Sequence, residues 1–285
     1  MSVVITGATG HLGRLVVESL LQQGVPARDI TAAGRDTTKI KDLADRGVRV
    51  RAIDYDDPAT LDGAFRGAAR ILLISASATG QRARQHGNAI DAARRAGAGL
   101  LAYTSIAHAD TTTLRMAEEH QASEAALRTS GLEYVLLRNS WYTENYTAQI
   151  PAILQRGSLP GSADDGRVSA ATRADYAAAA AAVLAGDGHA GRVYELGGDQ
   201  AFTLTEFAAE ISAQTGQPVS YHDLPVAEYA QLLISAGLPE PAAAIIADAD
   251  RGLARGDLYV DSGDLHQLIG RPTTSLHDAV AAALH

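Results

Sequence analysis

The feature of this sequence that most restricts its fold is a set of three glycines spaced three positions apart, at 7, 10 and 13. The stretch reads Gly7-Ala-Thr-Gly-His-Leu-Gly13; it directly follows the apolar run Val3–Ile5 and leads into apolar residues at helical spacing. A glycine-rich turn between a buried strand and a helix lets the backbone approach a pyrophosphate, and the helix N-terminus supplies oriented N–H donors. The alternative is a glycine-rich turn with a purely structural role. We expect the dinucleotide to be bound here by Gly7, Thr9, Gly10, His11, Leu12 and Gly13.

Strand-like and helix-like segments alternate over the first half of the chain. Further apolar β-type runs occur at Ile30–Ala33, Val48–Ile53, Ile71–Ile74, Leu100–Thr104 and Tyr134–Leu137, with helical patterns near 37–46, 58–66, 81–96 and 113–130 between them. This rhythm predicts a Rossmann-type α/β fold, a doubly wound parallel sheet with helices on both faces. The strands are almost continuously apolar, as in sheets that are covered on both sides.

The rhythm changes after about residue 138, where prolines and glycines become frequent. A loop-rich passage precedes an alanine-rich helix at Thr172–Leu184 and a strand at Val193–Leu196. Thr203-Leu-Thr-Glu206 has the spacing of a capping box, and the last helix is expected near 275–284. We predict an NADP-binding domain over 1–138, completed by parts of 165–197. A smaller α/β C-terminal lobe over 139–285 is expected to carry the substrate site, with the cleft between the two.

Composition excludes several classes of function. The 285 residues include no cysteine, which rules out disulfides, thiolate metal sites and cysteine nucleophiles and suits a cytoplasmic protein. The net charge is −9, and the short arginine clusters around Arg82-Arg84 and Arg94-Arg95 are expected on solvent-facing helix surfaces, so no nucleic-acid partner is expected. We also expect no secretory leader, no membrane span, no flavin and no metal site.

The end of the second predicted strand bears on which dinucleotide is bound. The sequence there is Ala33-Gly-Arg35-Asp36, with Lys39 one turn further on. An acidic residue at this place holds the ribose 2′-hydroxyl of NAD, whereas an arginine accommodates the 2′-phosphate of NADP. Arg35 therefore predicts NADPH, although Asp36 could face a ribose hydroxyl and Arg35 could be an ordinary surface residue.

Together with the glycine run and Arg35, several uncommon strings resemble the NmrA-like group of atypical short-chain dehydrogenases. Within that group the chain is most similar to the bacterial NAD(P)H:quinone oxidoreductases of the quinone oxidoreductase 2 type, and triphenylmethane dye reductases are similar too. The resemblance implies NADPH-dependent reduction of quinones. The strings are Leu72-Leu-Ile-Ser75, Gly80-Gln-Arg82, Ala102-Tyr-Thr-Ser105, His108-Ala-Asp-Thr111, Leu137-Arg-Asn139, Trp141-Tyr142, Glu144-Asn-Tyr146, Ala170–Ala177 and Val193-Tyr-Glu-Leu196.

The resemblance also implies further cofactor contacts, all at the carboxyl ends of predicted strands, where open α/β sheets bind ligands. Asp54 would accept a hydrogen bond from the adenine amino group; the alternative is a turn aspartate ahead of Pro58. The remaining positions would line the dinucleotide or border the nicotinamide, or else be ordinary turn or core residues. They are Ser75, Ala76, Ser77, Tyr103, Thr104 and Ser105.

The usual acid of short-chain dehydrogenases is missing from this chain. Those enzymes pair a tyrosine with a lysine four residues later, and the lysine lowers the pKa of the tyrosine. Here the only lysines are Lys39 and Lys41, and the corresponding helix instead places His120 four residues before Glu124. His120 could assist a proton transfer with Glu124 orienting it, or the two could be a pair on the helix surface. Quinone reduction tolerates this loss, because the oxygen that forms is a ring-stabilised phenolate and hydride transfer needs mainly alignment.

For the electron acceptor, the aromatic stretch after the sixth strand is the best candidate. It contains the only tryptophan of the chain, and flat acceptors stack on such rings while an amide can bond a carbonyl oxygen. The alternative is an aromatic hinge between the lobes. The residues expected to position the acceptor are Asn139, Trp141, Tyr142 and Tyr146.

Three functions remain open on the sequence. The first is an NADPH-dependent oxidoreductase that transfers a hydride directly to a quinone, as a monomer or homodimer. The second is a redox sensor of NmrA type, which binds NADP(H) without turnover. The third is a reductase of triphenylmethane or azo dyes with the same machinery.

Overall fold

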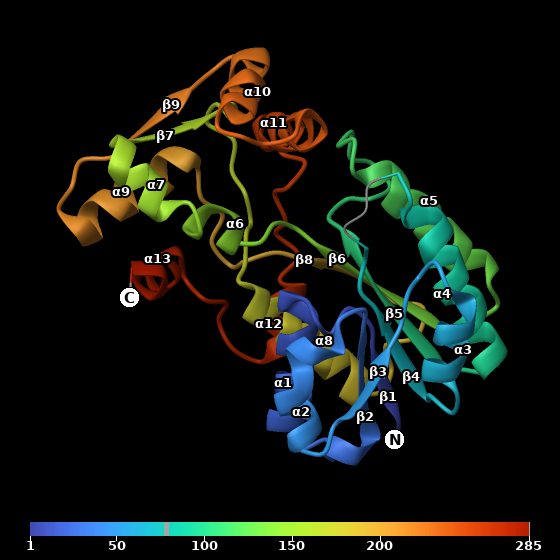
Figure 1. Ribbon diagram of the computed structural model, residues 1–285. Helices are drawn as coiled ribbons and strands as arrows, with labels where there is room; N and C mark the ends of the chain where they lie inside the picture. Colours follow the sequence, from blue (N-terminus) through green and yellow to red (C-terminus); the bar gives the residue numbers. More distant parts are fainter. Residues whose placement is uncertain (77–79, 285) are drawn as a thin grey trace.

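The computed structural model describes residues 1–76 and 80–284 of the chain (Figure 1). In these residues, a parallel seven-stranded sheet has the strand order β3-β2-β1-β4-β5-β6-β8. Its strands are β1 Val3–Ile5, β2 Ile30–Gly34, β3 Arg49–Ala52, β4 Arg70–Leu73, β5 Leu100–Ile106, β6 Tyr134–Asn139 and β8 Val193–Leu196. The chain winds outward from β1 to β2 and β3, then returns to β4 on the other side of β1, which confirms the predicted Rossmann-type fold.

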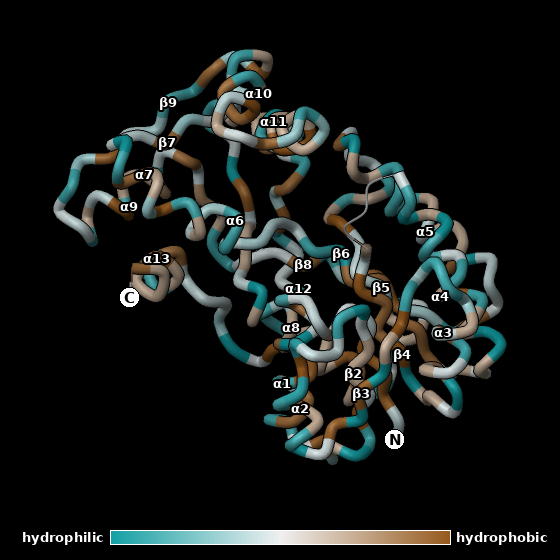
Figure 2. The backbone as a smooth tube through the Cα atoms, viewed as in Figure 1, coloured by the Kyte–Doolittle hydropathy of each residue, from teal (hydrophilic) through white to brown (hydrophobic). Residues whose placement is uncertain are grey.

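Alternate residues of the central strands enter two separate cores. Val3 and Ile5 belong to the core on one face of the sheet and Val4 to the core on the other, as the two-residue period of a strand requires. Helices α1 His11–Gln22, α2 Lys41–Asp45, α8 Arg173–Ala185 and α12 Asp264–Ile269 cover the first face. Helices α3 Pro58–Phe65, α4 Arg82–Ala96 and α5 Ala117–Thr129 cover the second. The apolar segments accordingly gather along the central strands in Figure 2.

Two details differ from the sequence-based expectation. Strand β3 is mostly exposed because it is the edge strand of the sheet, so its apolar character was overestimated. Helix α5 begins at Ala117 and not near residue 113, since Arg115 N donates to Asp248 Oδ2 and Ala117 N closes a turn onto Leu114 O.

The rest of the chain builds a second core around a small parallel sheet that the sequence analysis did not predict. This sheet pairs β7 Ser158–Gly161 with β9 Ser220–Asp223. The helices around it are α6 Glu144–Thr147, α7 Ile150–Arg156, α9 Leu204–Thr215, α10 Val226–Ser235, α11 Glu240–Arg255 and α13 Leu276–Leu284. The predicted capping box is present at the start of α9, where Thr203 and Glu206 bond each other's backbone N–H.

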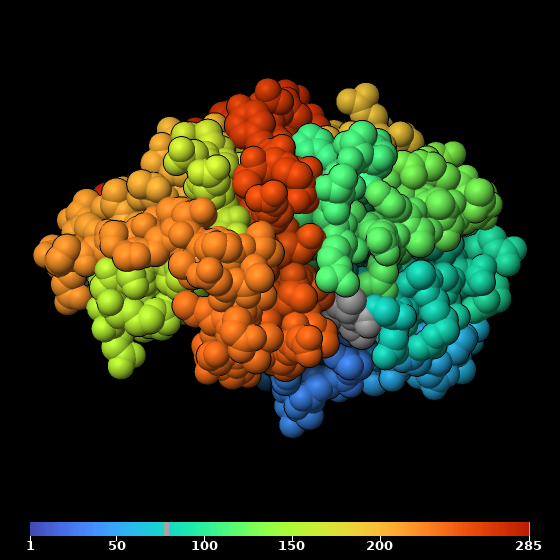
Figure 3. Space-filling model, turned by 90° about the horizontal axis from the view of Figure 1, so that it is seen from above, coloured from blue at the N-terminus to red at the C-terminus, as the bar shows by residue number. Residues whose placement is uncertain are grey.

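The two parts of the chain are joined at several places. Strand β8 extends the large sheet beside β6, and α12, from near the C-terminus, packs on α8. In the view of Figure 3 the orange chain of α11 meets the green chain before α5, where Arg115 N donates to Asp248 Oδ2 at 2.9 Å. The boundary at residue 138 remains a prediction, and a two-domain division would have to assign β8 and α12 to the first domain.

Candidate active site

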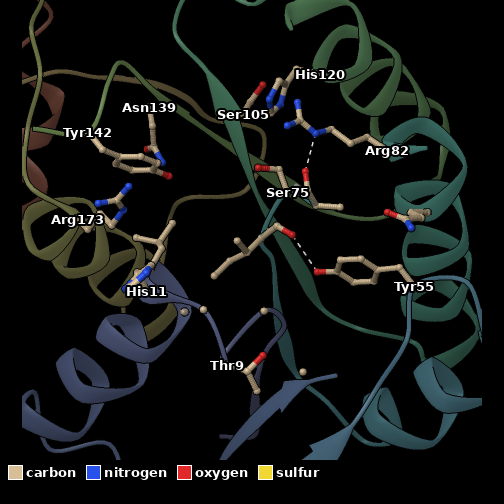
Figure 4. Close-up of a pocket in the computed structure, with 18 of the residues that line it drawn as sticks. Thr9, His11, Tyr55, Ser75, Arg82, Ser105, His120, Asn139, Tyr142 and Arg173 are labelled. Carbon is tan, nitrogen blue, oxygen red and sulfur yellow. Dashed lines mark hydrogen bonds between the residues drawn. The ribbon is translucent and has the colours of Figure 1, made fainter. Parts of the chain in front are cut away.

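A cavity of about 680 Å³ lies above the carboxyl ends of β1, β2, β4, β5 and β6, where the sequence analysis expected a ligand (Figure 4). Its walls come from the loops after these strands and after β3, from the starts of α1, α4, α6 and α8, and from α5. The sequence-predicted residues that line it are Gly7, Thr9, Gly10, His11, Leu12, Gly13, Arg35, Asp54, Ser75, Ala76, Ser105, His120, Asn139, Trp141 and Tyr142. The structure thus brings most of the candidate site together.

The glycine loop has the geometry of an anion cradle. Gly7 has φ +63°, and a Cβ at Gly13 would lie 2.4 Å from Gly7 O, so neither position accepts another residue without a backbone shift. Helix α1 begins after Gly10, and no side chain caps it. The first N–H groups of an α-helix have no partner within the helix, so they are available to an anion here. This backbone fits the pyrophosphate of a dinucleotide.

The cationic end of the cavity lies beyond β2. Arg35 and Lys39 line it, and both side chains are exposed. Asp36 is committed elsewhere, because its carboxylate accepts from Thr38 N at 3.2 Å and Thr38 Oγ1 at 2.5 Å and so caps the short 3₁₀ helix η2 Thr37–Ile40. These two bonds lower the pKa of Asp36. With Asp36 turned away, this end fits a phosphate better than a free ribose hydroxyl.

Asp54 and its neighbour Tyr55 form the wall below that end. Asp54 Oδ1 accepts from Asp56 N at 2.9 Å, which holds the carboxylate at the rim. Tyr55 was missed by the sequence analysis: its hydroxyl lies 2.5 Å from Thr6 Oγ1 and 2.9 Å from Ile74 O. Burial raises the pKa of Tyr55, so its hydroxyl stays protonated and links β1 to the loop after β4. Only its place beside Asp54 could have indicated this role.

The residues that end β4 and β5 divide into lining and supporting groups. Ser75 lines the cavity, and its N–H donates to Thr104 Oγ1 at 2.9 Å. Thr104 and Tyr103 are themselves buried and lie behind the cavity wall, not on its surface. Ser105 lines the cavity but donates its hydroxyl hydrogen to Glu124 Oε1 at 2.7 Å. The predicted contact Ser77 lies outside the described residues.

His120 lines the cavity and is nearly buried, so the pair on the helix surface that the sequence left open is not formed. Its Nδ1 lies 2.8 Å from the hydroxyl of Tyr103. Burial, with the nearby Arg82 and His86 adding to it, lowers the pKa of His120 to about 3, so the imidazole is neutral.

The structure gives Glu124 different partners from the expected one. Its carboxylate accepts from Arg138 at 2.7 and 2.9 Å, from Ser105 and from Arg128, so it is fully used by these cations and the hydroxyl. Tyr103, and not Glu124, is therefore the residue that orients His120.

On the opposite wall, a guanidinium covers the ring of Tyr142. Arg173 lies over the Tyr142 ring, 4.6 Å from its centroid. Arg173 donates to Asn145 Oδ1 at 2.9 Å and lies 3.5 Å from a Glu144 oxygen, which fixes the cation above the ring. Burial raises the pKa of Tyr142, so its hydroxyl remains a donor.

Tyr146 lies elsewhere than expected. It is buried in the second core, where its ring contacts Phe202 and Phe207 at centroid distances of 5.9 and 5.8 Å. The helical spacing of Tyr142 and Tyr146 suggested a shared face, but Tyr142 precedes α6, so the two rings diverge. Trp141 and Tyr142 are the aromatic residues of the predicted set that line the cavity.

Arg82 is the second residue the sequence analysis misplaced. Arg84, Arg94 and Arg95 are well exposed on α4, as expected. The Arg82 side chain, in contrast, is only 11% exposed and lines the cavity. It is the first residue of α4, so it faces the ends of the strands and not the outer helix surface. Its presence in the family-like string Gly80-Gln-Arg82 was the available indication.

Proteins of known family or structure that resemble this chain agree with a dinucleotide site of this geometry. A family model described as NAD(P)H-binding matches residues 7–187. Quinone oxidoreductase 2 of Escherichia coli (strain K12) is 50% identical over 279 residues, which cover 98% of this chain and 97% of the relative. The crystal structure of the NADPH-dependent quinone oxidoreductase 2 from Escherichia coli complexed with NADPH has a TM-score of 0.97 and covers 99% of this chain and 100% of its own.

Two other solved structures are similar to this chain to different degrees. The triphenylmethane reductase of Citrobacter sp. is 37% identical with a TM-score of 0.94, covering 100% of this chain and 99% of its own. Nmra, a negative transcriptional regulator in complex with NAD, is 14% identical with a TM-score of 0.81, covering 98% of this chain and 94% of its own, and shares the fold alone.

The fold and the glycine cradle define a Rossmann-type dinucleotide-binding protein. This chain belongs to the NAD(P)H-binding family, in its NmrA-like branch with quinone oxidoreductase 2, and the family predicted from the sequence is confirmed. In the described part of the chain, no helix combines the length and the apolar character that a membrane span needs.

Proposed function

We propose that this protein is an NADPH-dependent quinone oxidoreductase. The observation that carries the proposal is the continuous cavity that joins the glycine cradle and Arg35 at one end to the aromatic wall of Trp141 and Tyr142 at the other. Half of the sequence is identical to quinone oxidoreductase 2 over nearly the whole length of both chains, which supports the same activity. A cytoplasmic location and a monomeric or dimeric state remain predictions.

The residues of the cavity have distinct tasks in holding the cofactor. The first turn of α1 binds the pyrophosphate, while Arg35 and Lys39 bind the 2′-phosphate. Asp54 borders the adenine. Because the dinucleotide of a doubly wound fold straddles the point where the strand order reverses, the nicotinamide extends toward β5 and β6. Ser75, Ala76 and Ser105 then line its path. NADPH, when bound, supplies the hydride.

The acceptor occupies the remaining space between His120 and Tyr142. Trp141 and the Tyr142 ring give a flat acceptor an apolar surface, and the Tyr142 hydroxyl and Asn139 amide are donors within reach of a carbonyl oxygen. Asn139 and Tyr142 thus position the acceptor, and neutral His120 forms the other side. These groups align a quinone and exclude water without the tyrosine and lysine pair of other short-chain dehydrogenases.

Two other functions compete with this proposal. A triphenylmethane dye reductase is favoured by the 37% identity to the Citrobacter enzyme and by the same aromatic wall. A non-catalytic redox sensor needs only the cofactor site. The cavity extends beyond that site to Trp141 and Tyr142, which argues against a sensor role.

Consumption of NADPH with and without 1,4-benzoquinone, beside NADH, tests the proposal. We expect quinone-dependent oxidation that prefers NADPH, and Arg35→Ala should remove the preference by weakening NADPH binding about tenfold or more, because a charged hydrogen bond to phosphate is lost. Arg28→Ala, at the other end of β2, is the matched control and should keep it. Tight NADPH binding without consumption for any quinone would reject the reductase in favour of the sensor.

A further inference from the structure

Arg82 is a cation at the acceptor end of the cavity that no task above uses. It lies at the start of α4, and Figure 4 shows its guanidinium beside His120 and above Ser75. The charge of Arg82 is among the causes that lower the pKa values of both His120 and His86. A positive charge therefore acts on the reacting end of the cavity from a nearly buried side chain, where screening by water is weak.

The guanidinium is held in place but not saturated. Its Nε donates to Ala76 O at 2.5 Å, whereas Nη1 is buried and has no hydrogen-bond partner among the described residues. Glu119 is the nearest carboxylate: its Oε2 lies 4.0 Å from Arg82 Nε and also lacks a hydrogen-bond partner there. The other oxygen, Oε1, accepts from Gly80 N at 2.9 Å and Arg82 N at 3.0 Å and so fixes the first turn of α4. Buried donors without a partner are uncommon, so the guanidinium keeps unused hydrogen-bonding capacity while the Arg82 side chain itself lines the cavity.

Quinone reduction creates negative charge at this place. The C4–H bond of the reduced nicotinamide breaks with its electron pair, and the hydrogen forms an O–H bond to one quinone oxygen. The π electrons shift through the ring and leave the other quinone oxygen as an oxyanion, which then takes a proton from water to give the hydroquinone. We propose that Arg82 stabilises this oxyanion as it forms, an inference that rests on the proposed quinone reductase activity.

The same charge makes the site selective among acceptors. A cationic triphenylmethane dye is still partly positive in the transition state of hydride transfer, so a nearby cation opposes both its binding and the overall kcat/KM. A neutral quinone becomes an anion, so the same cation lowers its barrier. Arg82 therefore favours quinones over cationic dyes, and removing its charge should lower the quinone activity without lowering the dye activity.

The experiment compares Arg82→Gln and Arg82→Lys with Arg94→Gln, a control in the last turn of the same helix. For 1,4-benzoquinone, Arg82→Gln should lower kcat by about tenfold to a hundredfold, less than a full oxyanion-hole donor because Glu119 offsets part of the charge. For the cationic dye crystal violet, kcat/KM should stay level or rise. Arg82→Lys should restore part of the quinone rate, and Arg94→Gln should change neither activity.

Binding gives a second readout that does not depend on turnover. The complex with NADP⁺ is titrated with 4-nitrophenol, whose visible absorbance reports the phenolate. Arg82→Gln should raise the pKa of the bound phenol by about one unit, which corresponds to tenfold weaker phenolate binding, and should leave the Kd of NADPH within about twofold.

The outcomes separate the two proposals. Equal losses with quinone and dye, an unchanged pKa of the bound phenol, or a loss confined to NADPH affinity would each overturn the role of Arg82. A wild-type protein that reduces no quinone would instead reject the proposed function, whatever the phenol titration shows.

Discussion

His86 and His120 are two neutral imidazoles that both pack against the ring of Tyr103, and of the two only His120 lines the cavity. Burial, with Arg82 adding to it, lowers the pKa of His120 to about 3 and that of His86 to about 4. In the unfolded chain both titrate near pH 6.5, so the unfolded state binds more protons than the folded state between about pH 4 and 6.5. Stability should therefore fall as the pH falls through this window.

His120→Gln tests this pH dependence. From pH 7 to pH 5 the wild-type protein should lose about 2 kcal/mol more of its free energy of unfolding than the variant, because one proton-binding difference has been removed. Urea unfolding at the two pH values measures the change. Parallel losses in both proteins would show that His120 accepts a proton in the folded state.

At the scale of elements, one buried arginine ties three segments together. Arg138 at the end of β6 is 4% exposed and binds Glu124 of α5, Glu195 of β8 and Asp110 of the loop after β5. Replacing it by methionine should cost about 3 to 5 kcal/mol, since Glu124 would remain buried without its main partner.

Arg128→Met supplies the matched control for this prediction. Arg128 binds the same carboxylate at 2.9 Å but is 43% exposed, so its loss should cost less than about 1 kcal/mol. Chemical denaturation of both variants gives the two values. Equal costs would mean that burial of the pair does not decide its contribution.

The sequence predicted elements well where the pattern is local and poorly where tertiary contacts decide. The glycine run, the period of the first helix and the capping box at Thr203 are local features, and the structure contains each of them. The small sheet of β7 and β9 joins segments about 60 residues apart, so no local pattern announces it.

The same distinction explains the candidate site. Strand ends such as Ser75 and Asn139 could be placed in the cavity because parallel strands end at one edge. The direction of a side chain could not be predicted from the sequence. Arg82 points into the cavity and Tyr146 into the second core because tertiary contacts decide where each side chain lies. Tyr55 and Arg173 were missed for the same reason.

At the scale of the whole molecule, the cavity draws on both halves of the chain. Its lining runs from Gly7 to Arg173, and Asn145 and Trp141 come from beyond residue 138. NADPH bound at one hundred times its Kd should add about 2.7 kcal/mol to the free energy of unfolding, and this energy is shared by every segment that the ligand holds.

Hydrogen exchange with and without NADPH tests this coupling. Amides in 7–13 and in 139–147 and 172–176 should all exchange more slowly with the cofactor. Protection confined to residues before 138 would instead indicate a cofactor domain that binds independently of the rest. The control is the protein mixed with AMP in place of NADPH. Slower amide exchange should then be limited to the segments that follow β2 and β3.

The contact that Glu119 makes with the start of α4 has a consequence for how this wall is assembled. Glu119 accepts from the N–H groups of Gly80 and Arg82, which precede it by 39 and 37 positions, and β5 lies between these residues and Glu119. While a ribosome makes the chain from its N-terminus, α4 is complete in sequence well before its cap exists. We therefore expect the first turn of α4, and with it Arg82, to reach its final position only after α5 has emerged and docked.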